Sequence, residues 1–179
     1  MTAPKTEDGA AKASGSDAAL PGRNFAGPVE EIRPLIEDPL LKTALDYWES
    51  LRADAPALPS RKDLDPMAVP RLLPSILLID VMPDDRFEYR LAGARIEERY
   101  QMYDFPGKTP QEALGADAEK VLGPYRLVRD ERCLFYRDID DDWLRREPTF
   151  KSYRGLLLPF TADGTNVTTI VGVFSFVRR

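Results

Sequence analysis

The stretch from Leu58 to Gly93 constrains the fold more than any other part of the chain. It opens with a proline-bounded turn that contains Arg61. Asp65 and Pro66 then favour a short helix, because aspartate often caps a helix whose first residue is proline. Two strand-like segments joined by a turn complete the stretch. It therefore predicts a short helix followed by a β-hairpin.

The two predicted strands of this hairpin differ in pattern. Ser75–Val81 carries apolar residues on both faces, which is typical of a central strand that is covered on both sides. Arg86–Leu91 alternates instead, with Phe87, Tyr89 and Leu91 on one face and charged residues on the other. The alternation indicates a half-exposed strand near an edge of the sheet.

Composition and charge exclude several classes of protein. The 179 residues suffice for one domain with a tail, and the formal net charge of -5 argues against a partner bound through nucleic-acid phosphates. The chain contains no histidine, the commonest ligand of metals and of haem, so we expect no metal site. Its one cysteine, Cys133, excludes an internal disulfide and suits a reducing compartment.

Nothing in the sequence indicates a membrane. No apolar run approaches the roughly 20 residues that a membrane helix needs. The N-terminus also lacks the apolar region of a secretory signal. We therefore expect a cytoplasmic protein without membrane contact.

The chain divides into three predicted parts. Residues 1–28 are rich in Ala, Gly, Ser, Pro and charge, so we expect a disordered tail. Residues 29–57 form a helical lead-in, and residues 58–179 form the main domain. No internal repeat is visible.

The lead-in contains one clear amphipathic helix, Pro39–Arg52, with Asp38 placed to cap it. Leu41, Leu45 and Trp48 lie on its apolar face. Such a helix must cover either its own domain or that of a partner. These three residues are therefore candidates for the chain's own core or for a homodimer contact.

The rest of the chain predicts helices and then strands. Ala94–Leu114 reads as short helices and Asp117–Arg129 as a longer amphipathic one. Cys133–Asp138, Thr149–Pro159 and Val167–Val177 read as strands. The order is typical of an α+β fold, a five-stranded antiparallel sheet in the order 2-1-5-4-3 with helices packed on one face. The space between this sheet and its helices is a natural cavity.

Several apolar and tyrosine side chains are candidates for lining that cavity, since a ligand pocket combines apolar walls with a few polar groups. Ordinary core packing, with each hydroxyl reaching one partner, is the alternative. The candidates are Tyr89, Leu91, Ile96, Tyr100, Tyr125 and Val128.

Two arginines have a structural and a functional interpretation. Arg61 lies between Pro59-Ser60 and Asp63, and it either pairs with a nearby aspartate or anchors an anionic ligand through its guanidinium fork. Arg90, on the outer side of the second strand, has the same two interpretations. The acidic run 138–142 lacks the glycine spacing of a calcium loop, so we interpret it as a solvated loop.

Motifs along the chain resemble those of a bacterial family of small, largely stand-alone PAS proteins. The resemblance covers Leu40 to Val177 and rests on a Pro-Ser-Arg-x-Asp-x-x-Pro opening motif, a Leu-Leu-Pro before the first strand, a Tyr-Arg-Leu-x-Gly second strand and a later Gly-Lys-Thr turn. The matching positions are Pro59, Ser60, Arg61, Asp63, Pro66, Leu73, Pro74, Tyr89, Arg90, Leu91, Gly93 and Gly107.

The resemblance implies a PAS fold for residues 58–179 and a sensory or signalling role, without naming a ligand. Haem-binding PAS domains typically hold iron through histidine, which this chain lacks. Flavin and cinnamoyl photosensors need a chromophore cysteine within motifs that do not surround Cys133. None of these three cofactors is supported, and the cofactor is unknown.

Two functions remain open from the sequence. The first is a stand-alone PAS sensory module that binds a small molecule or a protein partner and acts in trans, since no output segment follows the last predicted strand. The alternative is a ligand-free dimeric adaptor that associates through the Pro39–Arg52 helix. No nucleophile and base pair is visible, so we expect no catalytic residues and no enzymatic activity.

Overall fold

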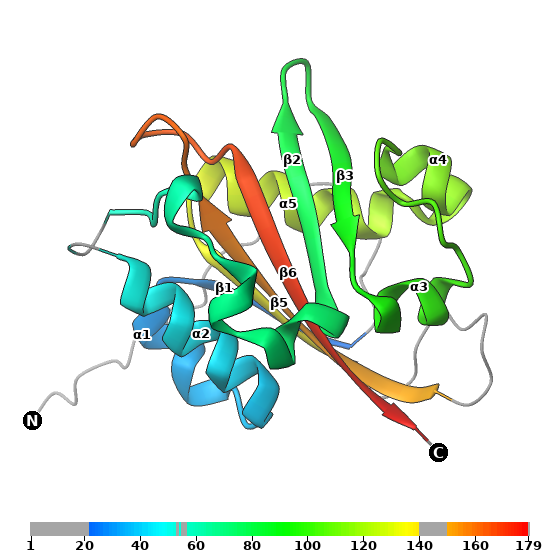
Figure 1. Cartoon of the computed structure of the whole chain (residues 1–179), viewed down its shortest axis with the longest axis horizontal. Helices are drawn as coiled ribbons and strands as arrows, with labels where there is room; N and C mark the ends of the chain where they lie inside the picture. The colour runs from blue at the N-terminus through cyan, green and yellow to red at the C-terminus, as the bar shows by residue number, and fades with distance from the viewer. Residues whose placement is uncertain (1–21, 53, 55–56, 140–149, 179) are drawn as a thin grey trace, which may run out of the picture.

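A computed structural model describes residues 22–52, 54, 57–139 and 150–178 of the chain. Its centre is one antiparallel sheet whose spatial order is β1-β4-β5-β6-β2-β3 (Figure 1). The strands are β1 Arg23–Gly27, β2 Ile76–Met82, β3 Arg86–Ala92, β4 Leu134–Ile139, β5 Phe150–Phe160 and β6 Thr169–Arg178.

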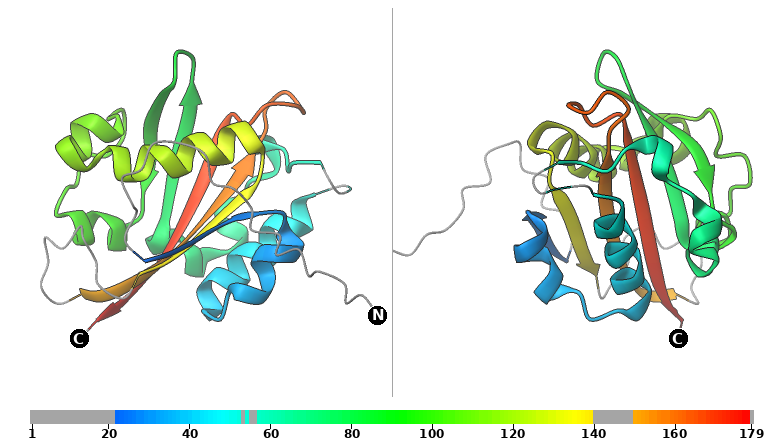
Figure 2. Two further views of the ribbon diagram at one scale, coloured as in Figure 1. Left: turned by 180° about the vertical axis from the view of Figure 1, so that it is seen from behind. Right: turned by 60° about the vertical axis from the view of Figure 1, so that its left-hand side comes forward.

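Helices cover both faces of this sheet (Figure 2). The first group, from the N-terminal part of the chain, is α1 Val29–Ile32, η1 Arg33–Leu35, α2 Pro39–Leu51, η2 Arg61–Asp63, η3 Pro66–Ala68 and η4 Pro70–Ser75. The second group is α3 Ala94–Tyr100, α4 Pro110–Leu114, η5 Gly115–Asp117 and α5 Glu119–Glu131. α2 lies on one face and α5 crosses the other. The prediction of helices on one face therefore describes only part of the helices, since the N-terminal amphipathic helix, which was predicted separately, covers the other face.

The predicted order 2-1-5-4-3 corresponds to β3-β2-β6-β5-β4, and these five strands lie in that order. A sixth strand, β1, pairs with β4 at the edge, where Phe25 lies opposite Tyr136. β1 falls within residues 1–28, which we predicted to be a disordered tail, so that boundary is corrected. Residues 1–21 lie outside the described part of the chain.

α2 is docked on its own sheet. The Asp38 carboxylate accepts hydrogen bonds from the backbone N–H of Leu40 at 2.8 Å and of Leu41 at 3.2 Å, which caps the helix. Leu41, Leu45 and Trp48 are buried, and the Trp48 indole donates to the Pro159 carbonyl at 2.9 Å. These side chains belong to the core of the chain itself and are not available as a dimer contact.

The stretch between α2 and β2 forms three short 3-10 helices. The Ser60 hydroxyl caps η2 and the Asp65 carboxylate caps η3. η4 ends where β2 begins, and Gly93 lies against it. A Cβ at Gly93 would overlap the carbonyl oxygen of Leu73 and the backbone of Pro74. The Leu-Leu-Pro segment and the glycine after β3 are therefore two sides of one close contact.

The pairing between β2 and β3 contains a bulge. Tyr89 lies opposite Ile79 and Leu91 opposite Leu78, so that Arg90 is an extra residue in β3. The bulge moves Leu91 to the opposite face from Tyr89. Leu91 is 40% exposed, whereas Tyr89 is buried. The predicted simple alternation ends at this bulge.

The helical lead-in and the sheet share one core. Val29, Ile32, Leu41 and Trp48 belong to the same buried cluster as the central strands. Helices that could cross a membrane are absent from the described residues.

Candidate functional site

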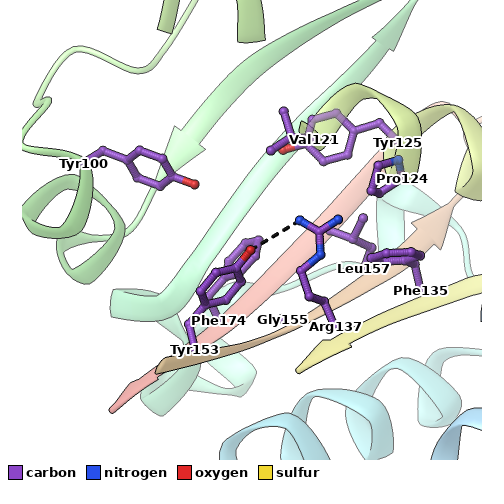
Figure 3. Close-up of a pocket in the computed structure, with 10 residues that line it drawn as sticks. All are labelled: Tyr100, Val121, Pro124, Tyr125, Phe135, Arg137, Tyr153, Gly155, Leu157 and Phe174. Atoms are coloured by element: carbon purple, nitrogen blue, oxygen red, sulfur yellow. Dashed lines mark hydrogen bonds between the residues drawn. The ribbon is translucent and has the colours of Figure 1, made fainter. Parts of the chain in front are cut away.

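A small cavity lies between the sheet and helix α5 (Figure 3). Its volume, measured as the space open to the centre of a water molecule, is about 30 Å³. That is room for roughly two water-sized groups. The lining residues are Tyr100, Val121, Pro124, Tyr125, Phe135, Arg137, Tyr153, Gly155, Leu157 and Phe174.

The strand register brings the floor of the cavity together. Arg137 of β4 lies opposite Gly155 of β5, and Gly155 in turn lies opposite Phe174 of β6. A Cβ at Gly155 would come within 2.8 Å of the Phe174 ring. The glycine therefore leaves the space that this ring occupies beside the arginine.

Among the described residues, Arg137 is the one charged side chain that lines the cavity, and it is only 5% exposed. Its Nε donates to the Asn24 side-chain oxygen at 2.8 Å. Its two terminal nitrogens make longer bonds of 3.3 Å, one to the Tyr153 hydroxyl and one to the Lys120 carbonyl. The guanidinium also lies 5.3 Å from the centre of the Phe135 ring.

All of these partners are uncharged, and no carboxylate of the described residues forms an ion pair with Arg137. The neighbouring Asp138 points to the other face of the sheet, where it pairs with Arg23 at 2.6 Å and with Arg154 at 3.3 Å. A buried guanidinium without a counterion is unfavourable, because water and opposite charge normally stabilise it. Arg137 therefore differs from the paired arginines elsewhere in the chain.

Tyr125 of α5 lines the cavity, and its hydroxyl lies next to that of Tyr89 on β3. The hydroxyls of Tyr89 and Tyr125 lie 3.4 Å apart, and both side chains are buried. Burial raises the pKa of Tyr125, although the hydrogen bond from Tyr89 and the charge of Arg137 each lower it. Burial likewise raises the pKa of Tyr89. Both phenols therefore stay protonated and present neutral polar groups.

One end of the cavity reaches solvent. Tyr100 and Phe174 are the half-buried members of the lining, and Tyr100 lies across from the other side chains in Figure 3. Phe174 also stacks with Phe176 at a centroid distance of 6.4 Å and packs against Tyr153 at 6.3 Å. The opening is therefore framed by aromatic rings, with the guanidinium inside.

The structure brings together only part of the predicted pocket. Tyr100 and Tyr125 line the cavity. Three other candidates are buried in the core without lining it, namely Tyr89, Ile96 and Val128. Leu91 lies on the opposite face of the sheet because of the bulge at Arg90, so it is not a lining residue.

The two arginines predicted as anchors lie away from the cavity. Arg90 is exposed and its Nε pairs with Asp80 at 2.5 Å across the hairpin, which favours its structural interpretation. The Arg61 backbone N–H donates to the Thr161 carbonyl at 2.7 Å. The aspartates of the described residues form no ion pair with its side chain, so the predicted pairing is absent there.

Sequence reasoning missed the residues that distinguish the site. Arg137 and Phe174 were not among the candidates, although Arg137 carried a usable signal. It interrupts the apolar run Leu134–Tyr136 within a predicted strand. A charge in a strand that is buried on both faces needs a partner, and the sequence offers none beside it on the same face.

A wider hollow lies between the β5–β6 turn and the end of α5, lined by Val81, Arg129, Asp130, Arg132, Asn166 and Val167. Two cations line it, Arg129 and Arg132. Arg129 pairs with Asp85 at 2.5 Å and with Asp130 at 2.6 Å, whereas Arg132 forms no ion pair with the described residues. The Asn166 side chain donates to Asp163. Three of the four polar or charged lining residues therefore already have partners.

The described part of the chain contains no cluster of metal-binding side chains. No group of three or more His, Cys, Asp or Glu side chains gathers there. Of the acidic run 138–142, Asp138 is paired with arginines, and residues 140–142 lie outside the described residues.

Comparison with known proteins supports the fold. A family model described as "PAS domain" matches residues 36–102. The match supports a PAS-fold domain. It spans α2, β2, β3 and α3, and the complete sheet is consistent with a PAS-like fold. No curated protein and no solved structure matches the chain.

PAS domains are in general sensory or interaction modules. Most of the cavity lining, including Arg137, lies outside the matched residues. The family match therefore supports the fold, whereas evidence for a ligand comes from the cavity itself.

Proposed function

We propose that this chain is a PAS sensory module that binds a small molecule between its sheet and helix α5 and signals through a protein partner. The observation that carries the proposal is the buried guanidinium of Arg137, which lines a cavity and has only uncharged partners among the described residues. A group that destabilises the fold is commonly kept where it serves binding.

The aromatic frame of the opening supports the same proposal. Ligand sites combine apolar and aromatic walls with a few polar groups that fix orientation. Here Phe135, Leu157 and Phe174 supply the walls, while Arg137 and Tyr125 supply polar groups.

The alternative, a ligand-free adaptor that dimerises through α2, loses its main support. Leu41, Leu45 and Trp48 are between 0% and 2% exposed within a single chain. A dimer through other surfaces is still compatible with the sensory proposal.

Native mass spectrometry of the protein purified from its own host tests the proposal. We expect a fraction of the chain to carry an additional non-covalent mass that gentle activation releases. Denaturing spectra of the same sample, which should show only the chain mass, are the control. Bare chain under gentle conditions, in preparations from several growth conditions, would argue against a ligand-binding module.

A further inference from the structure

We infer that the cavity is a site for a monocarboxylate with a short aromatic or apolar tail, whose carboxylate pairs with Arg137. The inference rests on the proposed sensory function and specifies the chemistry of its ligand. It joins three observations, which are the free donors of Arg137, the size of the cavity and the aromatic rings at its opening.

The donor count favours a carboxylate. A guanidinium has five N–H groups, and Arg137 uses three of them in its bonds to Asn24, Tyr153 and Lys120. Within the part of the chain that the structure describes, one N–H is left on each terminal nitrogen. Two donors in one plane match the two oxygens of a carboxylate, which is the usual partner of an arginine fork.

Charge favours a single negative group. No other cationic side chain of the described residues lines the cavity, and the Lys120 ammonium is directed to Asp117 at 2.8 Å. One guanidinium balances one carboxylate, whereas a phosphate dianion would bury an excess negative charge. Tyr125 adds a neutral hydroxyl on the same side, because burial keeps its pKa raised.

Size places the rest of the ligand at the opening. A space of about 30 Å³ holds a carboxylate but not a ring. The tail must therefore extend outward between Tyr100 and Phe174, which are the half-buried lining residues. Aromatic or aliphatic groups suit this exit, since they can stack on both rings.

Phenylacetate and its neutral isostere phenylacetamide test the inference on the full-length protein by isothermal titration calorimetry. We expect phenylacetate to bind and phenylacetamide to bind at least tenfold more weakly. Arg137→Gln should weaken phenylacetate binding by roughly 10- to 100-fold and leave the weak amide binding unchanged, since a charged hydrogen-bonded pair is lost.

Arg90→Gln is the matched control, because it removes the same charge from an exposed position on β3 away from the cavity. Its affinity for phenylacetate should stay within twofold of the wild type. The comparison of acid and amide on the wild-type protein does not depend on whether Arg137→Gln folds.

Three results would overturn the inference: equal binding of the acid and the amide, tighter binding of phenyl phosphate than of phenylacetate, or no binding of phenylacetate, benzoate and hexanoate. These failures are distinguishable from failure of the sensory proposal. A neutral or phosphorylated molecule found by native mass spectrometry would leave the proposed function standing while removing the carboxylate.

Discussion

At the scale of single residues, Gly93 shows how a motif position follows from packing. Its φ of -73° and ψ of 159° are accessible to any residue, so backbone conformation does not require glycine here. The requirement comes from the Leu73 carbonyl and the Pro74 backbone, which occupy the place of a Cβ. Both are main-chain atoms and cannot move aside as a flexible side chain would.

Gly93→Ala should therefore lower the free energy of unfolding by about 3 kcal/mol, since the β2–β3 hairpin must shift away from η4. Gly123→Ala is the matched control, because Gly123 lies within α5 and a Cβ there would meet no atom within 4 Å beyond its chain neighbours and the backbone of its own helix. That change should alter the free energy of unfolding by less than about 1 kcal/mol, since the higher helix propensity of alanine is offset by the contact of its Cβ with the ring of Pro124. Urea unfolding followed by circular dichroism measures both. Equal effects of the two substitutions would show that the contact at Gly93 is not restrictive.

Asp163 organises the turn between β5 and β6 through its carboxylate. Hydrogen bonds from Asn166 and from the backbone N–H of Thr165 hold the pKa of Asp163 well below the usual range of an aspartate. A depressed pKa in the folded state means that the contribution to stability is complete above the pKa of the unfolded chain. It is lost as the pH falls below about 4.

Asp163→Asn should accordingly lower stability at pH 7, where the wild-type carboxylate is ionised, and flatten the loss of stability between pH 4 and pH 2. The amide oxygen can still accept from the backbone but does not titrate in this range. Asp63→Asn, at an exposed aspartate whose carboxylate accepts no hydrogen bond from the described residues, is the control. Melting temperatures of the three proteins across this pH range test the prediction. If the melting temperatures of wild type and Asp163→Asn fall in parallel with pH, the carboxylate does not have this role.

At the scale of elements, α2 functions as the cover of one sheet face. Trp48 is 2% exposed, and its indole N–H reaches the Pro159 carbonyl of β5 at 2.9 Å. The bond links the helix to the strand that pairs with both β4 and β6.

Trp48→Phe should lower the free energy of unfolding by about 2 to 3 kcal/mol, because it leaves a buried carbonyl unpaired and removes part of a packed side chain. The control Tyr47→Phe removes a hydroxyl bonded to the Asp65 backbone on the exposed side of the same helix. We expect it to change stability by less than about 1 kcal/mol. Guanidinium unfolding monitored by circular dichroism compares the two. A dimer that dissociates on Trp48→Phe without loss of stability would instead favour the adaptor.

The order of elements could be predicted because its signals are local. Helix α2 follows from Asp38 and a regular apolar stripe, and the hairpin β2–β3 follows from two apolar segments around a turn. The bulge at Arg90 could not be predicted, since it depends on how β3 pairs with β2 rather than on its own pattern. For this reason, the prediction that Leu91 lies on the same face as Tyr89 was wrong.

Cover on both faces of the sheet was foreseeable in part. Ser75–Val81 was apolar on both sides, which requires cover on both faces, and the Pro39–Arg52 helix was left open as a cover of this domain or of a partner. β1 escaped prediction because Arg23–Gly27 is short and contains one large apolar residue, Phe25. Its place depends on pairing with β4, more than a hundred residues later in the sequence.

At the scale of the whole molecule, the candidate site depends on six separate segments of the described chain. They are β1 with Asn24, β4 with Arg137, β5 with Tyr153, β6 with Phe174, α5 with Tyr125 and α3 with Tyr100. Tyr100 and Tyr125 could be selected from the sequence because they lie on apolar helical faces. The arginine became recognisable only when the register of β4 and β5 placed it inside the cavity, with no carboxylate of the described residues paired with it.

We propose above all that Arg137 is kept for a ligand and not for the fold. The free energy of unfolding of ligand-free wild type and Arg137→Met, measured by urea denaturation, tests this most directly. We predict a variant that is as stable as the wild type or up to about 2 kcal/mol more stable, because an uncompensated buried charge is replaced by an apolar chain of similar length. A variant less stable by more than about 1 kcal/mol would contradict the proposal, since the guanidinium would then contribute to the fold itself.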